Sequence, residues 1–201
     1  MMSLGPVKVE GFLKIHDPNS GEIFVDKKNA IHYEHMSIAL AQSIANKNLG
    51  FIYAMAFGNG GSAVDPTGVI TYLPPNTTGT NADLYNQTYI KVVDNNSAAN
   101  TDPTRNNLTV LHTTGTVYTD VLVTCLLDYG EPAGQQAFDN STNFNGEFVF
   151  DELGLKSWEG AADDLMLITH VIFHPVQKSL NRQIQIDYTV RIQTLTSLSA
   201  A

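Results

Sequence analysis

Two histidines four residues apart, His170 and His174, could supply half of a metal site. On a helix this spacing would bring both imidazoles to one face. Their segment, LMLITHVIFHP (165–175), is instead short, apolar and β-branched, and Pro175 ends it, which predicts a strand. Strand residues advance about 3.3 Å each, so the two histidines would lie about 13 Å apart, too far for one ion. We expect both on the wetter face of a strand, with a pH-dependent contact between subunits as an alternative role.

A second pair, His32 and His35, lies in the one segment with helical periodicity. Asn29 is placed to cap this helix and Gly50 to follow it, which predicts a helix over about residues 30–48. The residues at helical steps are Ile31, Met36, Ala39, Leu40, Ser43 and Ile44. This stripe favours a helix that packs on the core over one that binds an ion through its histidines.

Cys125 is the only cysteine, which excludes an internal disulfide. Its neighbours in VLVTCLLDY (121–129) predict a buried strand and therefore an unreactive thiol, because reactive thiols need an accessible, electropositive setting. His112 and Asp128 match the residue types of a catalytic triad, but nothing in the sequence brings them together.

Glycines and paired acids could also mark a site. GNGG (58–61) lacks the Lys-Ser/Thr of a phosphate loop and precedes an Asp-Pro turn rather than a helix. We expect these glycines to permit either a positive φ at a strand end or a close backbone approach. Asp151 and Glu152 are adjacent, as are Asp163 and Asp164. Neighbouring strand residues point to opposite faces, so Asp151 and Glu152 would not act together as glycosidase carboxylates.

The composition argues against several classes of function. Only 15% of the residues are charged, against roughly 25% in an average domain, so Asn, Thr, Ser and Gly must cover the surface. A net charge of −9, with Lys27–Lys28 as the one adjacent basic pair, argues against nucleic-acid binding. MMSLGPVKVEG (1–11) lacks the apolar core of a signal peptide, and no apolar run reaches the roughly 20 residues of a membrane helix. We expect a protein made in a cytosol, without membrane contact, cofactor or metal.

The elements that must position these residues are mostly strands. VKVEGFLKIH (7–16) and GEIFVDKKN (21–29) flank a turn sequence and predict an N-terminal hairpin. The β-branched stretch 108–132 predicts one long strand or a pair broken near Gly115. IQIDYTVRIQ (184–193) alternates strictly between apolar and polar residues, so it predicts a strand with one dry face.

At least seven strand candidates against one helix predict a single mainly-β domain over residues 1–201. The expected architecture is an antiparallel β-sandwich, jelly-roll-like, with the helix packed on it. DNNSAANTDPTRNN (94–107) lacks periodicity and predicts a long exposed loop, in which Asp94 and Asp102 do not match the spacing of a calcium site.

Four residues are candidates for contacts with a partner chain: Asn59, Asn95, Asn106 and Trp158. Shortening the segment between Asn95 and Asn106 is expected to leave folding intact and impair assembly. Trp158 is expected in a polar loop, either as a contact for a partner or sugar or folded back over the sandwich edge.

One further pattern covers about residues 7–195 and includes EFVFDELGLKS (147–157), residues 165–194, FIYAMAFGNGG (51–61) and GVITYLPPN (68–76). In this pattern the chain resembles virion structural proteins of tailed bacteriophages. It implies a β-sandwich subunit of the virion, made in the host bacterial cytoplasm and placed in the neck, collar or head-tail connector. No catalytic residue is carried over, so the implied protein is not an enzyme.

The resemblance also implies partners: further copies in a closed ring, and portal, connector or tail proteins. The alternative virion roles are a capsid decoration protein, a tail terminator or a fibre-attachment subunit. Two other classes stay open, a carbohydrate-binding adhesin module and, least favoured, a hydrolase, because no catalytic constellation has the required spacing.

Overall fold

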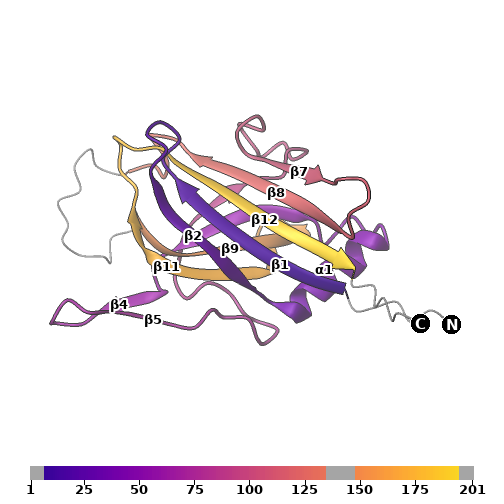
Figure 1. Cartoon of the computed structure of the whole chain (residues 1–201), viewed down its shortest axis with the longest axis horizontal. Coiled ribbons are helices and arrows are strands. Elements are labelled where there is room, and N and C mark those ends of the chain that lie inside the picture. The colour runs from indigo at the N-terminus through magenta and orange to yellow at the C-terminus, as the bar shows by residue number, and fades with distance from the viewer. Residues whose placement is uncertain (1–6, 135–147, 195–201) are drawn as a thin grey trace.

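The computed structural model describes residues 7–134 and 148–194, which contain twelve strands and one helix (Figure 1). The strands are β1 (Val7–His16), β2 (Ile23–Ile31), β3 (Ile52–Gly58), β4 (Ser62–Val64), β5 (Ile70–Tyr72), β6 (Gln87–Val92), β7 (Asn107–Leu111), β8 (Tyr118–Leu127), β9 (Val149–Ala161), β10 (Asp164–Leu167), β11 (Thr169–Gln177) and β12 (Ile184–Thr194). The helix α1 spans Tyr33–Ile44. No helix in these ranges is long and apolar enough to cross a membrane.

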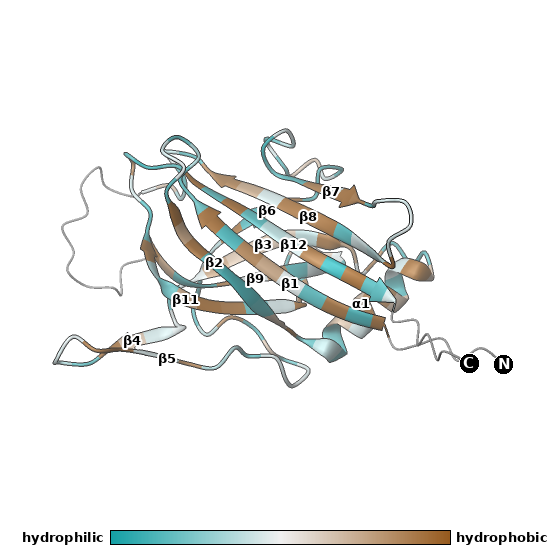
Figure 2. Cartoon of the chain, viewed as in Figure 1, coloured by the Kyte–Doolittle hydropathy of each residue, from teal (hydrophilic) through white to brown (hydrophobic). Residues whose placement is uncertain are grey.

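One antiparallel sheet forms the body, in the order β6-β3-β9-β11-β2-β1-β12-β8-β7, with β10 paired to β9 off this path. The sheet curls on itself, so that β2, β1, β12 and β8 cross in front of β9, β3 and β6 (Figure 2). Buried residues of both layers, such as Leu13 and Tyr188 in front and Met55 and Phe57 behind, form one core. The predicted mainly-β, sandwich-like fold with one helix is therefore confirmed, as a single curled sheet.

Side chains hold the two edges of the curled sheet near each other. Lys91, in the edge strand β6, donates from Nζ to the carbonyl oxygen of Leu126 in β8 at 2.8 Å and pairs with Glu131. Asn106, just before the other edge strand β7, accepts from the Leu126 amide at 2.9 Å. The first contact crosses from the edge strand β6 to β8, and the second joins the start of β7 to its neighbour β8.

The sequence patterns with a strict period are confirmed. In β12, Ile184, Ile186, Tyr188 and Val190 are buried, and the residues between them are partly exposed. β1 and β2 form the predicted hairpin, and the stretch before residue 128 is a strand pair broken near Gly115, whose φ is +90°. The alternation of apolar and polar residues predicts these strands correctly because each of them has one face on the core.

The predicted start of the helix is wrong. Asn29 belongs to β2, where it pairs with Gly11 of β1, and the residue that caps α1 is His32. The imidazole Nδ1 of His32 accepts a hydrogen bond from the His35 amide at 3.2 Å. Met36 and Ala39 pack on the core as expected, whereas Ile44, the last residue of the predicted stripe, is 84% exposed.

A second layer covers the outside of β3 and β9. Ala56, Leu84 and Leu167 form a small cluster there, so β3 is buried on both faces. At Gly154 in β9, a Cβ would lie 2.5 Å from the Thr169 carbonyl oxygen, so only glycine permits this close packing. The covering segment before Leu84 also reaches the polar residues described below.

Candidate functional site: an anchored arm

The strands β4 and β5 form a hairpin separate from the main sheet, which we call the arm (residues 62–72). Its turn is held by Asp65, whose carboxylate accepts from the amides of Thr67 and Val69, and Gly68 has a φ of +86°. Figure 1 shows the arm extending along and beyond one end of the body. In the sequence, the Asp-Pro turn at 65–66 indicates that the chain reverses here. The segment GVITYL (68–73) by itself predicts an ordinary strand of the body.

The arm is apolar and exposed. Val64 is 39% exposed, Val69 56% and Tyr72 50%, and Leu73 directly after the arm is 46% exposed. Figure 2 shows hydrophobic residues along the arm, outside the body. Apolar side chains gathered on a projecting element are typical of a surface that another chain covers.

A buried carboxylate fixes the beginning of the arm. Asp151, in β9, accepts from the Gly61 amide at 2.9 Å and from the Ser62 amide at 2.8 Å, and the Ser62 hydroxyl also donates to it. Burial raises the pKa of Asp151 above its ordinary value, although the bonds from Ser62 and Gly61 oppose the rise. The arm therefore leaves the body from a fixed point.

The next residue, Glu152, holds the segments on either side of the arm. Its carboxylate accepts from the amides of Gly60 at 3.1 Å, Asn86 at 2.8 Å and Tyr85 at 2.9 Å, and from His170. Burial acts to raise the pKa of Glu152, but these four hydrogen bonds outweigh it and lower the pKa below its ordinary value. Glu152 is therefore an anion inside the protein, and three backbone amides and His170 stabilise its carboxylate in place of water.

His170 completes this cluster, and the prediction that it lies on the wetter face of its strand is wrong. Its Nδ1 accepts from the Asn76 amide at 2.8 Å, so Nε2 carries the proton and donates to Glu152 at 2.9 Å. Neither side chain is exposed. Residues 73–86 cover this part of β11, which the local sequence pattern could not show.

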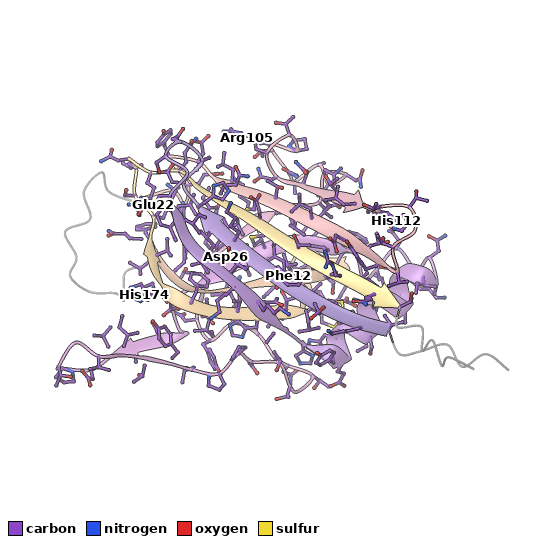
Figure 3. All side chains as sticks on the ribbon, viewed as in Figure 1. Phe12, Glu22, Asp26, Arg105, His112 and His174 are labelled. Atoms are coloured by element: carbon purple, nitrogen blue, oxygen red, sulfur yellow. The ribbon has the colours of Figure 1, made fainter. Side chains whose placement is uncertain are left out.

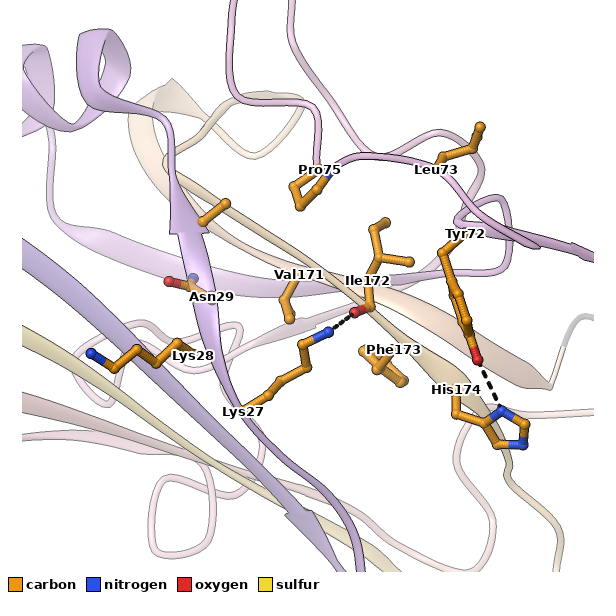
Figure 4. A pocket seen from close by; sticks show the side chains of 11 residues that line it. Lys27, Lys28, Asn29, Tyr72, Leu73, Pro75, Val171, Ile172, Phe173 and His174 are labelled. Atoms are coloured by element: carbon orange, nitrogen blue, oxygen red, sulfur yellow. Dashed lines mark hydrogen bonds between the residues drawn. The ribbon is translucent and has the colours of Figure 1, made fainter. Parts of the chain in front are cut away.

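His174 is exposed and lies at the base of the arm. The β11–β9 register shifts between Ile172 and Val176, so the strand is not regular between the two histidines. The Tyr72 hydroxyl and His174 Nδ1 form a hydrogen bond of 3.1 Å (Figure 4). Both histidines lie on one strand, as predicted, but the predicted bounds are wrong: the strand is interrupted at Ile168, between β10 and β11, and β11 continues through Pro175 to Gln177. The two histidines contact different segments around the arm.

An open groove of about 510 Å³ runs between the base of the arm and the body (Figure 4). Its walls are β2, β11 and the chain after the arm. Lys27 donates from Nζ to the Ile172 carbonyl oxygen at 2.6 Å, so its ammonium is directed to the backbone. The groove has a mixed lining, with apolar residues such as Leu73, Val171 and Phe173 beside polar ones such as Asn29 and Lys28.

The hydrogen-bonding groups of Glu152 and His170 are occupied within the protein. Both nitrogens of His170 are engaged, and Glu152 accepts four hydrogen bonds. A general base needs a free lone pair within reach of a substrate proton, and a nucleophile needs access. This arrangement positions a projecting hairpin instead.

The other candidate groups do not converge either. Cys125 is buried, as predicted, and burial raises its pKa to about 12. His112 contacts Tyr118 and Thr119, whereas Asp128 binds Arg105 and Gln183. His112 and His174 lie at opposite ends of the molecule (Figure 3).

The histidines of the helix are committed to the backbone. His32 Nε2 donates to the Gly79 carbonyl oxygen at 3.1 Å, and His35 Nδ1 donates to that of Leu167 at 2.7 Å. Their rings stack with centroids 3.6 Å apart. Burial lowers the pKa of His32, and His35 adds to this effect. Across residues 7–134 and 148–194, no group of three or more His, Cys, Asp or Glu side chains is arranged to hold a metal ion.

The glycines of GNGG permit a close approach, one of the two expected roles. A Cβ on Gly58 would lie 2.5 Å from both the Asn86 carbonyl oxygen and Glu152 Oε1, and one on Gly61 would lie 2.7 Å from Ile172 Cδ1. The alternative role, a positive φ, is not observed at these glycines. The glycines let the backbone reach the two buried carboxylates.

The four predicted contact residues have different surroundings. Asn59, beside the arm, accepts a side-chain hydrogen bond from Asn86, and Asn95 is exposed in its loop. Asn106 is only 1% exposed, so its placement on an exposed loop is wrong. Its side chain donates to the Asp102 carbonyl oxygen and accepts from Leu126, which ties the loop 94–107 to the body.

Trp158 lies in β9 rather than in a polar loop, so that prediction is wrong. The strand continues to Ala161 and turns directly into β10, and the indole packs against Tyr53 with centroids 4.6 Å apart and against Phe51 at 6.3 Å. Of the two alternatives for its side chain, folding back on the body is the one observed.

An apolar opening of about 250 Å³ lies at the other end of the molecule, between α1 and the strands β7, β8 and β12. The residues that line it are Met36, Ala39, Leu40, Ser43, Gly50, Phe51, Ile52, Leu108, Val110, Val121, Ile168, Val190 and Ile192. None of these lining residues is charged. Sequence reasoning missed this opening because its lining comes from six separate segments.

Comparison of the chain with protein-family models, with curated proteins and with solved structures returns no match.

Proposed function

We propose that this protein is a non-enzymatic structural subunit of a tailed-phage virion that assembles with further copies into a ring at the neck, collar or head-tail connector. The observation that carries the proposal is the exposed apolar arm, fixed to the body by the buried carboxylates of Asp151 and Glu152. The virion setting rests on the sequence resemblance.

The arm supports an assembly role on physical grounds. Fully burying one Val, Leu or aromatic side chain contributes about 1.5–3 kcal/mol, so covering several of them would stabilise a contact between chains. Holding the arm rigidly lowers the entropy lost on association. A surface with only 15% charged residues also suits interfaces, whose cores are depleted of charge.

An adhesin role lacks a comparable observation. Sugar-binding surfaces present accessible aromatic rings gathered on one face. The one tryptophan packs on Phe51 and Tyr53, and the exposed rings of Tyr72 (50%) and Tyr33 (71%) lie on different elements, the arm and α1. The buried position of Glu152 and His170 likewise gives the hydrolase alternative no accessible dyad.

The test is assembly. The purified full chain, measured by light scattering over a range of concentrations, should form a discrete oligomer, alone or on purified particles of a phage that encodes it. Mass spectrometry of those particles should give a copy number equal to one ring, whereas a much larger number would indicate a capsid decoration protein. A strict monomer that never joins particles would overturn the proposal.

A further inference from the structure

Residues 73–86 connect the arm to β6 and are hydrogen-bonded to β9 and β11; we call them the strap. The structure describes all of them: they form no helix or strand, and Leu84 is the only one that is buried. We propose that the strap is a pH-sensitive device. Neutral His170 and His32 hold it on the body, and protonation of these two rings releases it.

His170 holds the strap through an unprotonated nitrogen. Its Nδ1 accepts from the Asn76 amide at 2.8 Å, its Nε2 donates to Glu152 at 2.9 Å, and β2 places the uncharged Ala30 opposite it. A second proton on the ring would go to Nδ1, where it would face the N–H of Asn76, and one donor cannot bind another. The Glu152 carboxylate stabilises a positive ring. Protonated His170 therefore stays on Glu152 and releases Asn76.

Other ionisable groups lie around His170, on β9 and on the strap. From β9, Lys156 pairs with Asp83 of the strap at 2.8 Å, and Asp151 binds the beginning of the arm. Tyr85 of the strap lies against the imidazole, with ring centroids 5.6 Å apart. Ordinary Lys and Tyr side chains titrate near pH 10 and ordinary carboxylates near pH 4, so a change between pH 7 and pH 5 indicates histidine. Burial raises the pKa of Asp151, so this acid needs its own control.

His32 holds the middle of the strap in the same way. It caps α1, so its Nδ1 accepts from the His35 amide, and its Nε2 donates to the Gly79 carbonyl oxygen at 3.1 Å. A proton on Nδ1 would face the His35 N–H and place a positive charge at a helix N-terminus, where cations are unfavourable. Burial and His35 lower the pKa of His32, and Gly79 and Glu34 oppose them without outweighing them. Protonation therefore favours a state in which the ring leaves its site and the bond to Gly79 is lost.

The two rings act in the same direction. A histidine that must be neutral in the closed state and titrates near pH 6.5 in the open state favours opening by about tenfold for each pH unit below that value. When one opening frees both rings, the factor rises to about a hundredfold for each unit. Apart from Leu84, the residues of the strap are exposed or partly exposed, so few apolar contacts oppose a local opening. The strap is therefore closed at pH 7.5 and is released as the pH falls below 6.5.

Amide hydrogen exchange of the full chain, followed by NMR from pH 7.5 to pH 5, tests the device. After correction for the intrinsic exchange rate, the protection factor of the Asn76 amide should fall at least tenfold between pH 7 and pH 5. It should stay below that of the Tyr188 amide in the core strand β12, which distinguishes local opening from global unfolding. Unchanged protection of Asn76, or protection equal to that of Tyr188 throughout, would overturn the proposal.

The ring nitrogens can be observed directly in the wild type. At pH 7.5 the ¹⁵N shifts of His170 and His32 should show an unprotonated Nδ1 and a protonated Nε2. Both rings should gain their second proton over the pH range in which the strap loses protection. A proton on Nδ1 of either ring at pH 7.5 contradicts the proposal.

A double variant, His170→Asn with His32→Asn, removes both titrating groups. The Asn oxygen can accept from Asn76 or cap α1 in place of Nδ1, and it takes up no proton in this range. Circular dichroism at pH 7.5 establishes that the variant is folded. Its strap protection should change less than twofold between pH 7 and pH 5, even where the lost Gly79 bond lowers the protection at both values.

Two single variants are the controls. His112→Asn removes an exposed histidine at the other end of the molecule from the arm (Figure 3), and Asp151→Asn removes the acid with the raised pKa. Both should lose strap protection with falling pH as the wild type does. Loss of the pH dependence in either control, or its persistence in the double variant, assigns the response to another group and overturns the histidine device. These measurements do not depend on assembly, so their failure leaves the proposed function standing.

Discussion

His170 Nε2 and Glu152 Oε2 lie 2.9 Å apart, and neither side chain has any exposed surface. Two residue types that often carry out acid–base chemistry are used here to connect β9, β11 and the segments on either side of the arm. Every polar group of the pair has a partner, which is the condition under which a buried charge is tolerated. The pair therefore acts as an anchor, and its energetics can be measured.

Glu152→Gln should strongly destabilise the fold. The new amide NH₂ would face N–H donors that now bind a carboxylate, and each hydrogen bond to a charged group that is lost costs about 1.5–3 kcal/mol. Urea unfolding at pH 7 measures the loss. Glu22→Gln is the control, because Glu22 is exposed and should change stability by less than about 0.5 kcal/mol. Equal stability of both variants would contradict the anchor role.

The two neighbouring acids should respond to pH with opposite signs. The pKa of Glu152 is lowered in the folded state, so its contribution is present above its unfolded pKa and is lost as the pH falls through the folded pKa. The difference in free energy of unfolding between wild type and Glu152→Gln should therefore become smaller as the pH falls from 6 to 3. The pKa of Asp151 is raised in the folded state, so protonation favours folding. The free energy of unfolding of the wild type should therefore rise relative to that of Asp151→Asn as the pH falls over the same range. Urea unfolding curves of the wild type and both variants, measured at several pH values, test the two predictions.

Lys178 gives a third pH signature, on the alkaline side. Its side chain is fully buried and donates to the carbonyl oxygens of Tyr129 and Ser179, and burial lowers its pKa to about 8. Between about pH 8 and the unfolded value of about 10.4, the unfolded chain holds the proton and the folded chain does not, so stability rises with pH. Relative to Lys178→Met, the wild type should gain stability from pH 8 to pH 10. Lys28→Met, with an exposed ammonium, should show no such trend.

Patterns with a local cause were readable in the sequence. Alternation in β12 and the turn between β1 and β2 depend on residues near each other in the chain, and both were predicted. The helix start was not, because Asn29 is kept in β2 by its pairing with Gly11, eighteen positions earlier in the sequence.

The site was harder to predict because distant segments create it. His170 is buried by residues 73–86, and Asn76 supplies the amide that fixes its tautomer. Nothing within the strand LMLITHVIF indicates that cover, and a strand pattern gives alternation but not what lies on each face. Trp158 was misplaced for a related reason, since polar and small residues follow it although the strand continues.

Asn106→Ala should destabilise the protein, in contrast to the expectation from sequence that the loop 94–107 is dispensable for folding. The substitution leaves the buried Leu126 amide without its acceptor, which costs about 1–3 kcal/mol. Asn95→Ala is the control, because Asn95 is exposed and its bond to the Leu108 amide is long, at 3.4 Å. Thermal unfolding of the two variants compares their midpoint temperatures, and similar midpoints would show that Asn106 does not hold the loop.

Gly58→Ala should cost more stability than Gly61→Ala, although both glycines lie at the root of the arm. A Cβ on Gly58 would meet the Asn86 backbone oxygen at 2.5 Å, and a backbone atom can move only with its whole segment. A Cβ on Gly61 would meet the methyl end of Ile172 at 2.7 Å, which can rotate away. We expect a loss of about 1–3 kcal/mol for Gly58→Ala and a smaller one for Gly61→Ala in urea unfolding. The reverse order would mean that the carboxylate cluster yields more readily than the Ile172 side chain, against the tight anchoring argued for Glu152.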